Sequence, residues 1–141
     1  MDFLRSGKRY LLIDAFDRQE SLGKGNMPAL GPDLHAEVAR KFADRPQVAV
    51  VKGFLPDVLK TIPVPEKIAF LTISLGVARP TLATISELFP RVSPGGMVII
   101  ESYGHNFGPY KEIQPMMDYW AASVGHMICE LPTGQGLIVK H

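Results

Sequence analysis

The chain has 141 residues, 46% of them hydrophobic and 21% charged, and its 15 basic and 14 acidic side chains leave a formal net charge of +1. This composition predicts one globular domain over residues 1–141, with none of the basic stripe that nucleic-acid binding requires. The single cysteine, Cys129, excludes an internal disulfide framework, and no apolar run is long enough for a membrane span or a signal-peptide core, so we expect a cytoplasmic protein.

Four short apolar runs alternate with longer amphipathic stretches along the chain. The runs are YLLID (10–14), VAVVKG (48–53), IAFLTIS (68–74) and MVIIES (97–102). Because they are continuous rather than alternating, they indicate strands that are covered on both faces. The order of elements predicts an α/β fold with a mostly parallel sheet and helices on both faces.

The stretches between and after these runs predict three helices and a hairpin. Apolar residues recur at helical spacing over 32–44 and 79–89. A third helix is expected over 108–124, where Pro115 should kink it or delay its start. Two apolar segments flank PTGQ and predict an antiparallel C-terminal hairpin over about 126–140, with a glycine at its turn.

Polar residues follow the predicted strands, where ligands of open α/β sheets bind. The first strand ends at Asp14, the second at Lys52 and Gly53, and the fourth at Glu101 and Ser102. A carboxylate such as that of Asp14 can accept both hydroxyls of a ribose. The same residue can equally be a solvated turn aspartate that caps the next segment, and both interpretations stay open here.

Three segments, LLIDAF (11–16), VVKGFLPDVL (50–59) and 67–104, resemble the macrocin O-methyltransferase (TylF-type) family in order and spacing. The resemblance implies a class I methyltransferase-like (Rossmann-like) fold, with S-adenosylmethionine as the methyl donor. It also implies a magnesium-assisted methyl transfer to a sugar or phenolic hydroxyl. It covers nearly the whole chain and is most specific over Lys67–Tyr103.

The resemblance also assigns candidate residues for the cofactor. Asp14 falls where the family has its ribose-binding acid, and Phe16 follows in the same segment. Lys52, Gly53 and Phe54 fall on the segment that flanks the adenine. These five residues are the predicted cofactor-binding residues.

The chain departs from the family at the residues that carry the chemistry. It reads Ser74-Leu75-Gly76 where the family has Asp-Gly-Asp, and Glu101-Ser102-Tyr103 where the family has Asp-Asp-Tyr. Glu101 is the remaining metal-ligand candidate, and one carboxylate beside serine hydroxyls is a weak cage for Mg²⁺, which makes magnesium binding doubtful. His105 and Tyr103 are candidates to replace the general base, although a loop histidine can also be merely solvated.

The family's first strand and its glycine-rich loop have no counterpart in the opening MDFLRSGKRY, so we expect a truncated fold that binds S-adenosylmethionine weakly at most. The favoured function is a methyltransferase-like domain that is not catalytic by itself and acts as a binding or assembly subunit. The alternative is part of a working S-adenosylmethionine-dependent, magnesium-assisted O-methyltransferase. A nucleotide-binding domain without chemistry ranks last, because no phosphate-binding loop is found.

The absent central strand would leave two strand edges without partners. YLLID and IAFLTIS contain no Lys or Pro to discourage pairing. We therefore expect another protein chain as the partner, in a homo-oligomer or a hetero-complex. Apolar side chains outside the regular pattern offer further contact material: Phe3, Leu4, Met116, Met117, Tyr119 and Trp120.

Overall fold

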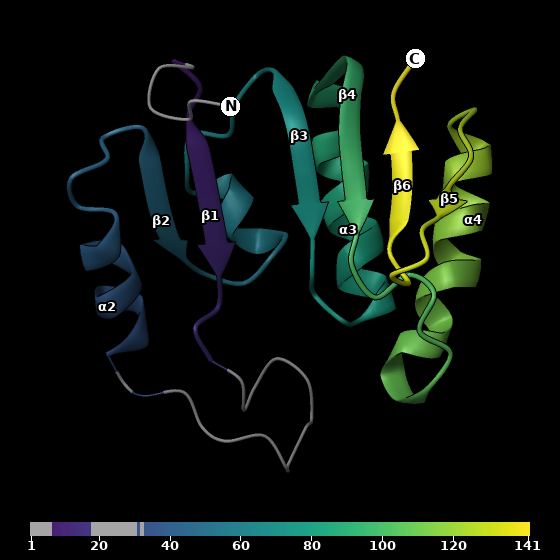
Figure 1. Cartoon of the computed structure of the whole chain (residues 1–141), viewed down its shortest axis with the longest axis horizontal. Helices are drawn as coiled ribbons and strands as arrows, with labels where there is room; N and C mark the ends of the chain where they lie inside the picture. The colour runs from purple at the N-terminus through teal and green to yellow at the C-terminus, as the bar shows by residue number, and fades with distance from the viewer. Residues whose placement is uncertain (1–6, 18–30, 32) are drawn as a thin grey trace. The chain divides into compact units, whose positions relative to one another are not determined.

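In the computed structural model of the chain, residues 7–17, 31 and 33–141 are described (Figure 1). The chain divides into two compact units, Met1–Thr61 and Ile62–His141. The hydrogen-bonded ladders of the described strands form two sheets, one in each unit, where the sequence predicted a single sheet. The prediction of one domain over 1–141 stays a prediction.

The first unit is a parallel strand pair with a helical crossover. Its elements are β1 (Tyr10–Asp14), α2 (Leu34–Lys41), β2 (Val48–Lys52) and the short 3-10 helix η2 (Asp57–Lys60). α2 packs against β2, and its half-buried Leu34 and Val38 recur at helical spacing, as predicted. Because β1 and β2 are parallel and in register, Asp14 lies opposite Lys52 and both carboxyl ends share one edge.

The second unit is a mixed four-stranded sheet with the order β3-β4-β6-β5. Its strands are β3 (Ile68–Ile73), β4 (Val92–Ile100), β5 (Cys129–Glu130) and β6 (Gly136–Val139). Its helices are α3 (Ala78–Leu88), η3 (Phe89–Arg91), η4 (Gly108–Glu112) and α4 (Ile113–Ser123). β3 and β4 are parallel, while β6 is antiparallel to β4 and β5, which confirms the predicted C-terminal hairpin.

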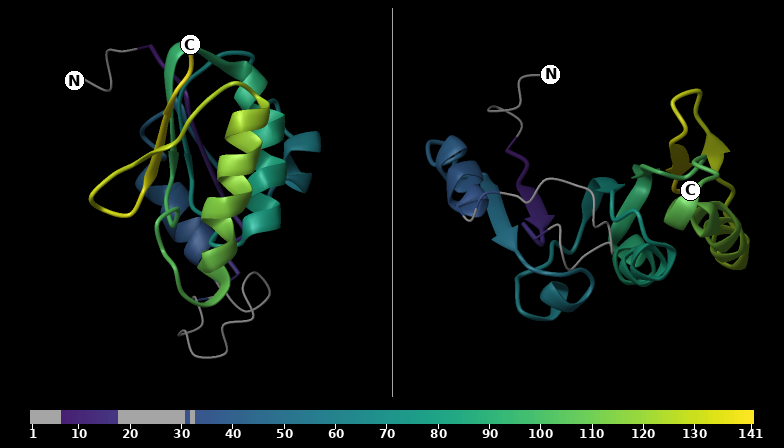
Figure 2. Two further views of the ribbon diagram at one scale, coloured as in Figure 1. Left: turned by 90° about the vertical axis from the view of Figure 1, so that its right-hand side faces the viewer. Right: turned by 90° about the horizontal axis from the view of Figure 1, so that it is seen from below.

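The core of the second unit lies between its sheet and its two α-helices. Val98 and Ile100 of β4 pack against Ile85 of α3 and Met117 of α4, and each of the four is at most 1% exposed. Trp120 closes the same cluster from α4. Both helices lie on one side of β4 and β6 in the left view of Figure 2. The helices of this unit therefore cover one face of its sheet.

β4 is longer than its apolar run predicted, because the glycines before it are part of the strand. Gly95 has a φ of 77°, the left-handed conformation that favours glycine. A Cβ at Gly96 would lie 2.7 Å from the Ser93 carbonyl oxygen. The Lys140 backbone brackets this irregular stretch by donating to the Gly96 carbonyl at 2.9 Å and accepting from the Gly95 N–H at 2.7 Å.

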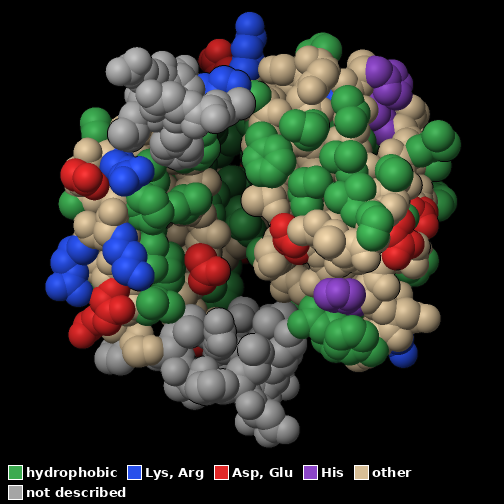
Figure 3. Space-filling model, in the orientation of Figure 1, with side chains coloured by type: hydrophobic (Ala, Val, Ile, Leu, Met, Phe, Trp, Pro, Cys, Tyr) green, Lys and Arg blue, Asp and Glu red, His purple; other side chains and the backbone are tan. Residues whose placement is uncertain are grey.

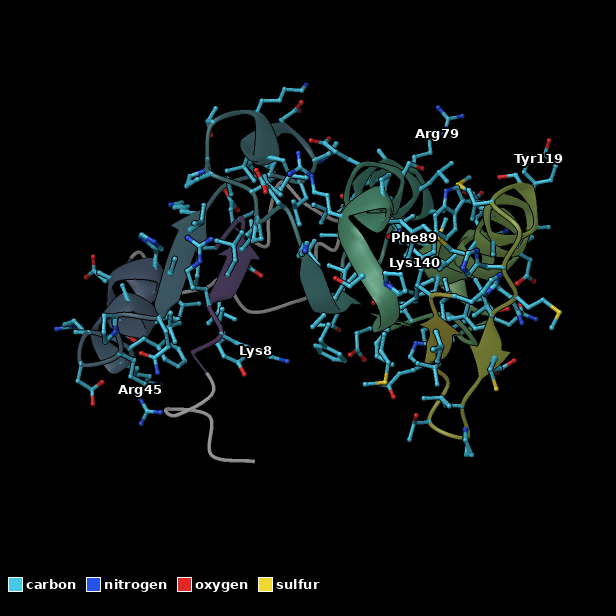
Figure 4. All side chains as sticks on the ribbon, turned by 90° about the horizontal axis from the view of Figure 1, so that it is seen from above. Lys8, Arg45, Arg79, Phe89, Tyr119 and Lys140 are labelled. Atoms are coloured by element: carbon cyan, nitrogen blue, oxygen red, sulfur yellow. The ribbon has the colours of Figure 1, made fainter. Side chains whose placement is uncertain are left out.

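The end of the chain is also tied down by the Lys140 side chain. Its ammonium donates to the Phe89 carbonyl at 2.8 Å and lies 4.9 Å from the centroid of the Phe89 ring. Figure 4 shows the two residues side by side. The aromatic ring of Phe89 meets Trp120 edge to face at 5.1 Å, so this contact connects β6 to the core.

Pro115 delays the third predicted helix, one of the two outcomes that the sequence allowed. α4 begins at Ile113 and follows the 3-10 helix η4, so Pro115 falls in the first turn, where its missing N–H is not needed. Two of the residues suggested as contact material, Met117 and Trp120, belong to the core instead. Tyr119 is 82% exposed, and Phe3 and Leu4 lie outside the described residues.

Candidate functional site

The carboxyl ends of β1 and β2 bring four of the five predicted cofactor residues to one edge of the two-stranded sheet in the first unit. Asp14 and Lys52 are register partners, and the Gly53 N–H donates to the Asp14 carbonyl at 3.0 Å. Phe16 comes two residues after Asp14, and its ring meets that of His35 edge to face at 5.0 Å. Asp14 and Lys52 therefore lie at one edge of the β1-β2 pair, and the cofactor-binding role of these residues stays a prediction.

The contacts of Asp14 are those of a turn-capping aspartate. Its Oδ1 accepts a hydrogen bond from the Phe16 N–H at 2.6 Å. This bond supports the backbone of Phe16, which has a φ of 51°, a left-handed conformation unusual for a side chain of this size. One carboxylate oxygen is thus used within the chain, whereas a ribose diol is bound best by both. The ribose-binding role of Asp14 stays a prediction.

The glycine at position 53 has a packing reason of its own. A Cβ there would overlap the side chain of Val58, so only glycine fits against the start of η2. Phe54 is 46% exposed and Lys52 is exposed. Their side chains are accessible to a ligand, but the described residues of this unit give them no enclosing pocket.

The second candidate edge is the carboxyl end of β3 and β4, where Glu101 is held by neutral donors. The Thr72 hydroxyl donates to Glu101 Oε1 at 3.2 Å, and the Gln135 amide donates to Oε2 at 2.7 Å. The Thr133 hydroxyl in turn donates to the Gln135 amide oxygen at 2.8 Å. Both carboxylate oxygens of Glu101 therefore have partners from the protein.

These residues do not fit a magnesium site. Mg²⁺ prefers several hard anionic oxygens in octahedral geometry. Within the described residues, no three His, Cys, Asp or Glu side chains gather where they could hold one ion. Ser74 and Ser102 are neutral where the resemblance implies acids, and Gly76, with a φ of 68°, occupies a backbone position that favours glycine.

Tyr103 is buried in the core rather than presented to a substrate. Its side chain is 3% exposed, and its hydroxyl donates to the Asp118 carboxylate at 2.5 Å. Burial, and then the hydrogen bond to Asp118, raises the pKa of Tyr103 to about 12. The phenol thus keeps its proton at neutral pH, which does not suit a general base.

His105 lies on the surface in a group of aromatic rings. It stacks on Phe107 with centroids 5.5 Å apart and meets Tyr110 edge to face at 5.7 Å. Phe107 is 61% exposed. His105 is accessible, but none of the contacts found for it joins it to a carboxylate that would orient it as a base. Its catalytic role stays a prediction.

Three residues that were not predicted contact the candidate residues: Thr72, Gln135 and Asp118. Thr72 is the only hydroxyl-bearing residue inside the IAFLTI strand, and this was a usable signal. Gln135 comes from the turn of the C-terminal hairpin, 34 residues after Glu101, and Asp118 comes from α4. No local pattern identifies such distant partners.

Comparisons with known proteins confirm the predicted fold class. The family model described as Macrocin-O-methyltransferase (TylF) matches residues 35–119. The chain is similar to the O-methyltransferase NovP, with a TM-score of 0.73 and 19% identity over 95% of this chain and 60% of that one. It is also similar to CalS11, a calicheamicin methyltransferase, with a TM-score of 0.65 and 14% identity over 93% and 60%.

An apo structure of CalS11, titled as a TDP-rhamnose 3'-O-methyltransferase, gives a TM-score of 0.61 and 19% identity over 93% of this chain and 58% of that one. At these identities the likeness establishes the fold alone. The chain spans about three fifths of the length of these solved structures. No curated protein sequence matches it. None of the described helices is long and apolar enough to span a bilayer.

Proposed function

Because the chain belongs to the macrocin O-methyltransferase (TylF) family, we propose that it is a methyltransferase-like domain that does not catalyse methyl transfer by itself. We propose that it acts as a binding or assembly subunit and works against another protein chain. Its cytoplasmic location remains a prediction. The fold is inherited from enzymes, and the departures lie in the residues that would do chemistry.

The observation that carries this proposal is the environment of Glu101 and Tyr103. Both carboxylate oxygens of Glu101 accept hydrogen bonds, one from the Thr72 hydroxyl and one from the Gln135 amide. Ser74 and Ser102 are neutral where the resemblance implies acids. Tyr103 is a protonated donor to Asp118. This arrangement supports neither a multidentate magnesium ligand set nor a base that could take the proton of an acceptor hydroxyl.

S-adenosylmethionine, the donor used by methyltransferases of this kind, would supply the methyl group if bound. The residues of this chain that could contact it are Asp14, Phe16, Lys52, Gly53 and Phe54, which lie at one edge of the first unit. Because Asp14 already caps the Phe16 N–H, we expect weak binding at most.

Titration calorimetry of the whole chain with S-adenosylmethionine tests this proposal. We expect no binding at micromolar concentration and no methyl transfer to sugar or phenolic acceptors. Micromolar binding that is lost in Asp14→Ala would contradict the proposal. The matched control is Asp44→Ala, because Asp44 is an exposed carboxylate that precedes β2, at the opposite end of the same strand pair.

The alternative, part of a working magnesium-assisted O-methyltransferase, is favoured by one observation. About two fifths of the length of the solved structures that it resembles has no match in this chain. In that case a longer polypeptide that includes these 141 residues would transfer methyl groups. Its magnesium dependence would then be lost in Glu101→Gln, and this result would replace the proposed function with the alternative.

A further inference from the structure

Three buried side-chain atoms of the described residues have no hydrogen-bond partner: His35 Nε2, Thr84 Oγ1 and His126 Nε2. Thr84 is 1% exposed in the middle of α3, out of reach of a ligand. His126 packs on Phe89, which precedes β4 and so lies at the amino-terminal edge of its parallel strands. His35 differs from both because it lies at a carboxyl edge, where ligands of open α/β sheets bind. A buried nitrogen without a partner there calls for an explanation.

The position of His35 follows from its contact with Phe16. His35 is the second residue of α2, and its ring meets that of Phe16 edge to face at 5.0 Å. Phe16 comes two residues after Asp14, the last residue of β1, and the Gly53 N–H donates to the Asp14 carbonyl. His35 and Phe16 therefore lie together at the carboxyl edge of β1 and β2, and we call them the ring pair.

The backbone of Phe16 is a second unfavourable feature of the ring pair. Its φ of 51° is a left-handed conformation that a large side chain rarely adopts. The Asp14 carboxylate supports this conformation through one hydrogen bond, which it accepts from the Phe16 N–H. Unfavourable backbone conformations of this kind gather at ligand sites and switches. The strained Phe16 backbone and the unpartnered His35 Nε2 thus belong to two rings in direct contact.

We propose that the ring pair is the closed form of a binding site for a planar nitrogen heterocycle such as a purine base. In this form the Phe16 ring takes the place of the ligand beside His35. When a heterocycle binds, the Phe16 ring moves away, its backbone leaves the left-handed conformation, and the ligand forms a hydrogen bond with His35 Nε2. Binding then removes both unfavourable features. This inference rests on the proposed binding role of the domain.

The side chains at this edge favour an aromatic heterocycle. Phe16 and His35 supply two rings, and Phe54, which follows Gly53 at the end of β2, is 46% exposed. Planar bases pack well on aromatic side chains. A neutral imidazole nitrogen can donate or accept a hydrogen bond, so His35 Nε2 can pair with an N–H or with a ring nitrogen of the ligand. A purine base offers both at its edge.

Charge gives no advantage to an ionic ligand at this edge. Asp14 and Lys52 are register partners of opposite sign, so their charges offset each other. Figure 3 shows basic and acidic side chains mixed over α2 and β2. A sugar is also less suitable, because Asp14 already uses one carboxylate oxygen to accept from the Phe16 N–H. We therefore expect the base alone to be recognised, without a ribose.

NMR titration of the whole chain with adenine tests this inference. The chain has four histidines, and the imidazole signal that is missing from His35→Phe identifies His35. Millimolar adenine should shift the His35 signal, whereas ribose at the same concentration should not. The backbone amide of residue 16 reports the affinity in every variant. His35→Phe keeps an aromatic ring but no nitrogen, so it should bind adenine roughly tenfold more weakly.

Phe16→Gly tests the closed form separately. Glycine adopts a positive φ readily and leaves no ring beside His35, so this variant should bind adenine about tenfold more tightly than the natural chain. It keeps the inference testable even if His35→Phe does not fold. His35→Gln should keep most of the binding, because its amide can replace Nε2. The matched control is Glu37→Gln, which should bind as the natural chain does, since Glu37 is exposed on the same helix.

Three results would overturn the inference: no shift of the His35 signal in the natural chain or in Phe16→Gly, equal affinities of these two chains for adenine, or an affinity that His35→Phe leaves unchanged. A shift of the His35 signal with ribose alone would also overturn it. These outcomes are separate from failure of the proposed function, which appears as micromolar S-adenosylmethionine binding or as methyl transfer.

Discussion

The two faces of the β3-β4-β6-β5 sheet are built from the same kind of sequence and end in different environments. Val98 and Ile100 lie under α3 and α4, whereas Met97, their neighbour in the same apolar run, is almost half exposed. The strand MVII is apolar on both faces, but the helices of this unit reach only one. An apolar run thus specifies a strand that needs cover on both faces, without specifying what covers the second.

The same contrast extends to the residues at the carboxyl end of the sheet. Tyr103 belongs to the covered side, where burial fixes its hydroxyl on Asp118 and raises its pKa to about 12. Glu101 shares its face with the exposed Thr72 and is held by hydrogen bonds alone. Burial governs the behaviour of one residue, and polar contacts govern the other.

The largest expected effect comes from cutting side chains on opposite faces of β4. Ile100→Ala should lower the free energy of unfolding of the second unit by about 2 to 5 kcal/mol, because it leaves a cavity under the helices. Met97→Ala, on the face opposite Ile100, should cost less than about 1 kcal/mol when the chain is dilute. Urea unfolding followed by the fluorescence of Trp120, the single tryptophan, measures both.

Ile138 and Val139 on β6 provide a matched pair for the same comparison, since Ile138 is 1% exposed and Val139 is 53% exposed. Ile138→Ala should resemble Ile100→Ala, and Val139→Ala should resemble Met97→Ala. Equal costs on the two faces in dilute solution would mean that the face carrying Met97 and Val139 is covered within the single chain. This result would contradict the contrast between the two faces of the sheet.

An intermediate effect is expected from the ionisation of Tyr103. An unfolded tyrosine loses its proton near pH 10, whereas folded Tyr103 keeps its proton up to about pH 12. Between these values the unfolded chain has lost a proton that the folded chain retains, so stability falls as the pH rises. The expected loss is about 2 to 3 kcal/mol from pH 10 to 12, and the full stability is present below pH 10.

Tyr103→Phe should remove this part of the pH dependence, because phenylalanine does not titrate. Tyr119→Phe is the control, since Tyr119 is 82% exposed, and this variant should keep the natural slope. Urea unfolding at a series of pH values gives both slopes. Identical slopes for the natural chain and Tyr103→Phe would show that Tyr103 is not buried against Asp118 as described.

The sequence predicted the elements better than their surroundings. Continuous apolar runs located four strands, and the PTGQ turn located the hairpin, because both depend on local side-chain patterns. The contact of Glu101 with Gln135 could not be predicted, because it joins residues 34 apart through the hairpin. The early start of β4 was missed because Gly95 and Gly96 read as a turn, although Gly96 pairs with Lys140.

The smallest expected effect concerns Glu101, just beyond the carboxyl end of β4. Glu101→Gln keeps the shape of the side chain; its amide oxygen can accept from Gln135 and its amide nitrogen can donate to the Thr72 hydroxyl, so two charge-assisted bonds become neutral ones, at a cost of about 1 kcal/mol. Millimolar magnesium should leave the unfolding free energies of the natural chain and of Glu101→Gln unchanged, because the described residues contain no group of three His, Cys, Asp or Glu side chains that could hold one ion. The control is Glu87→Gln on the exposed side of α3. Magnesium stabilisation that is present in the natural chain and in Glu87→Gln but absent in Glu101→Gln would restore Glu101 as a metal ligand.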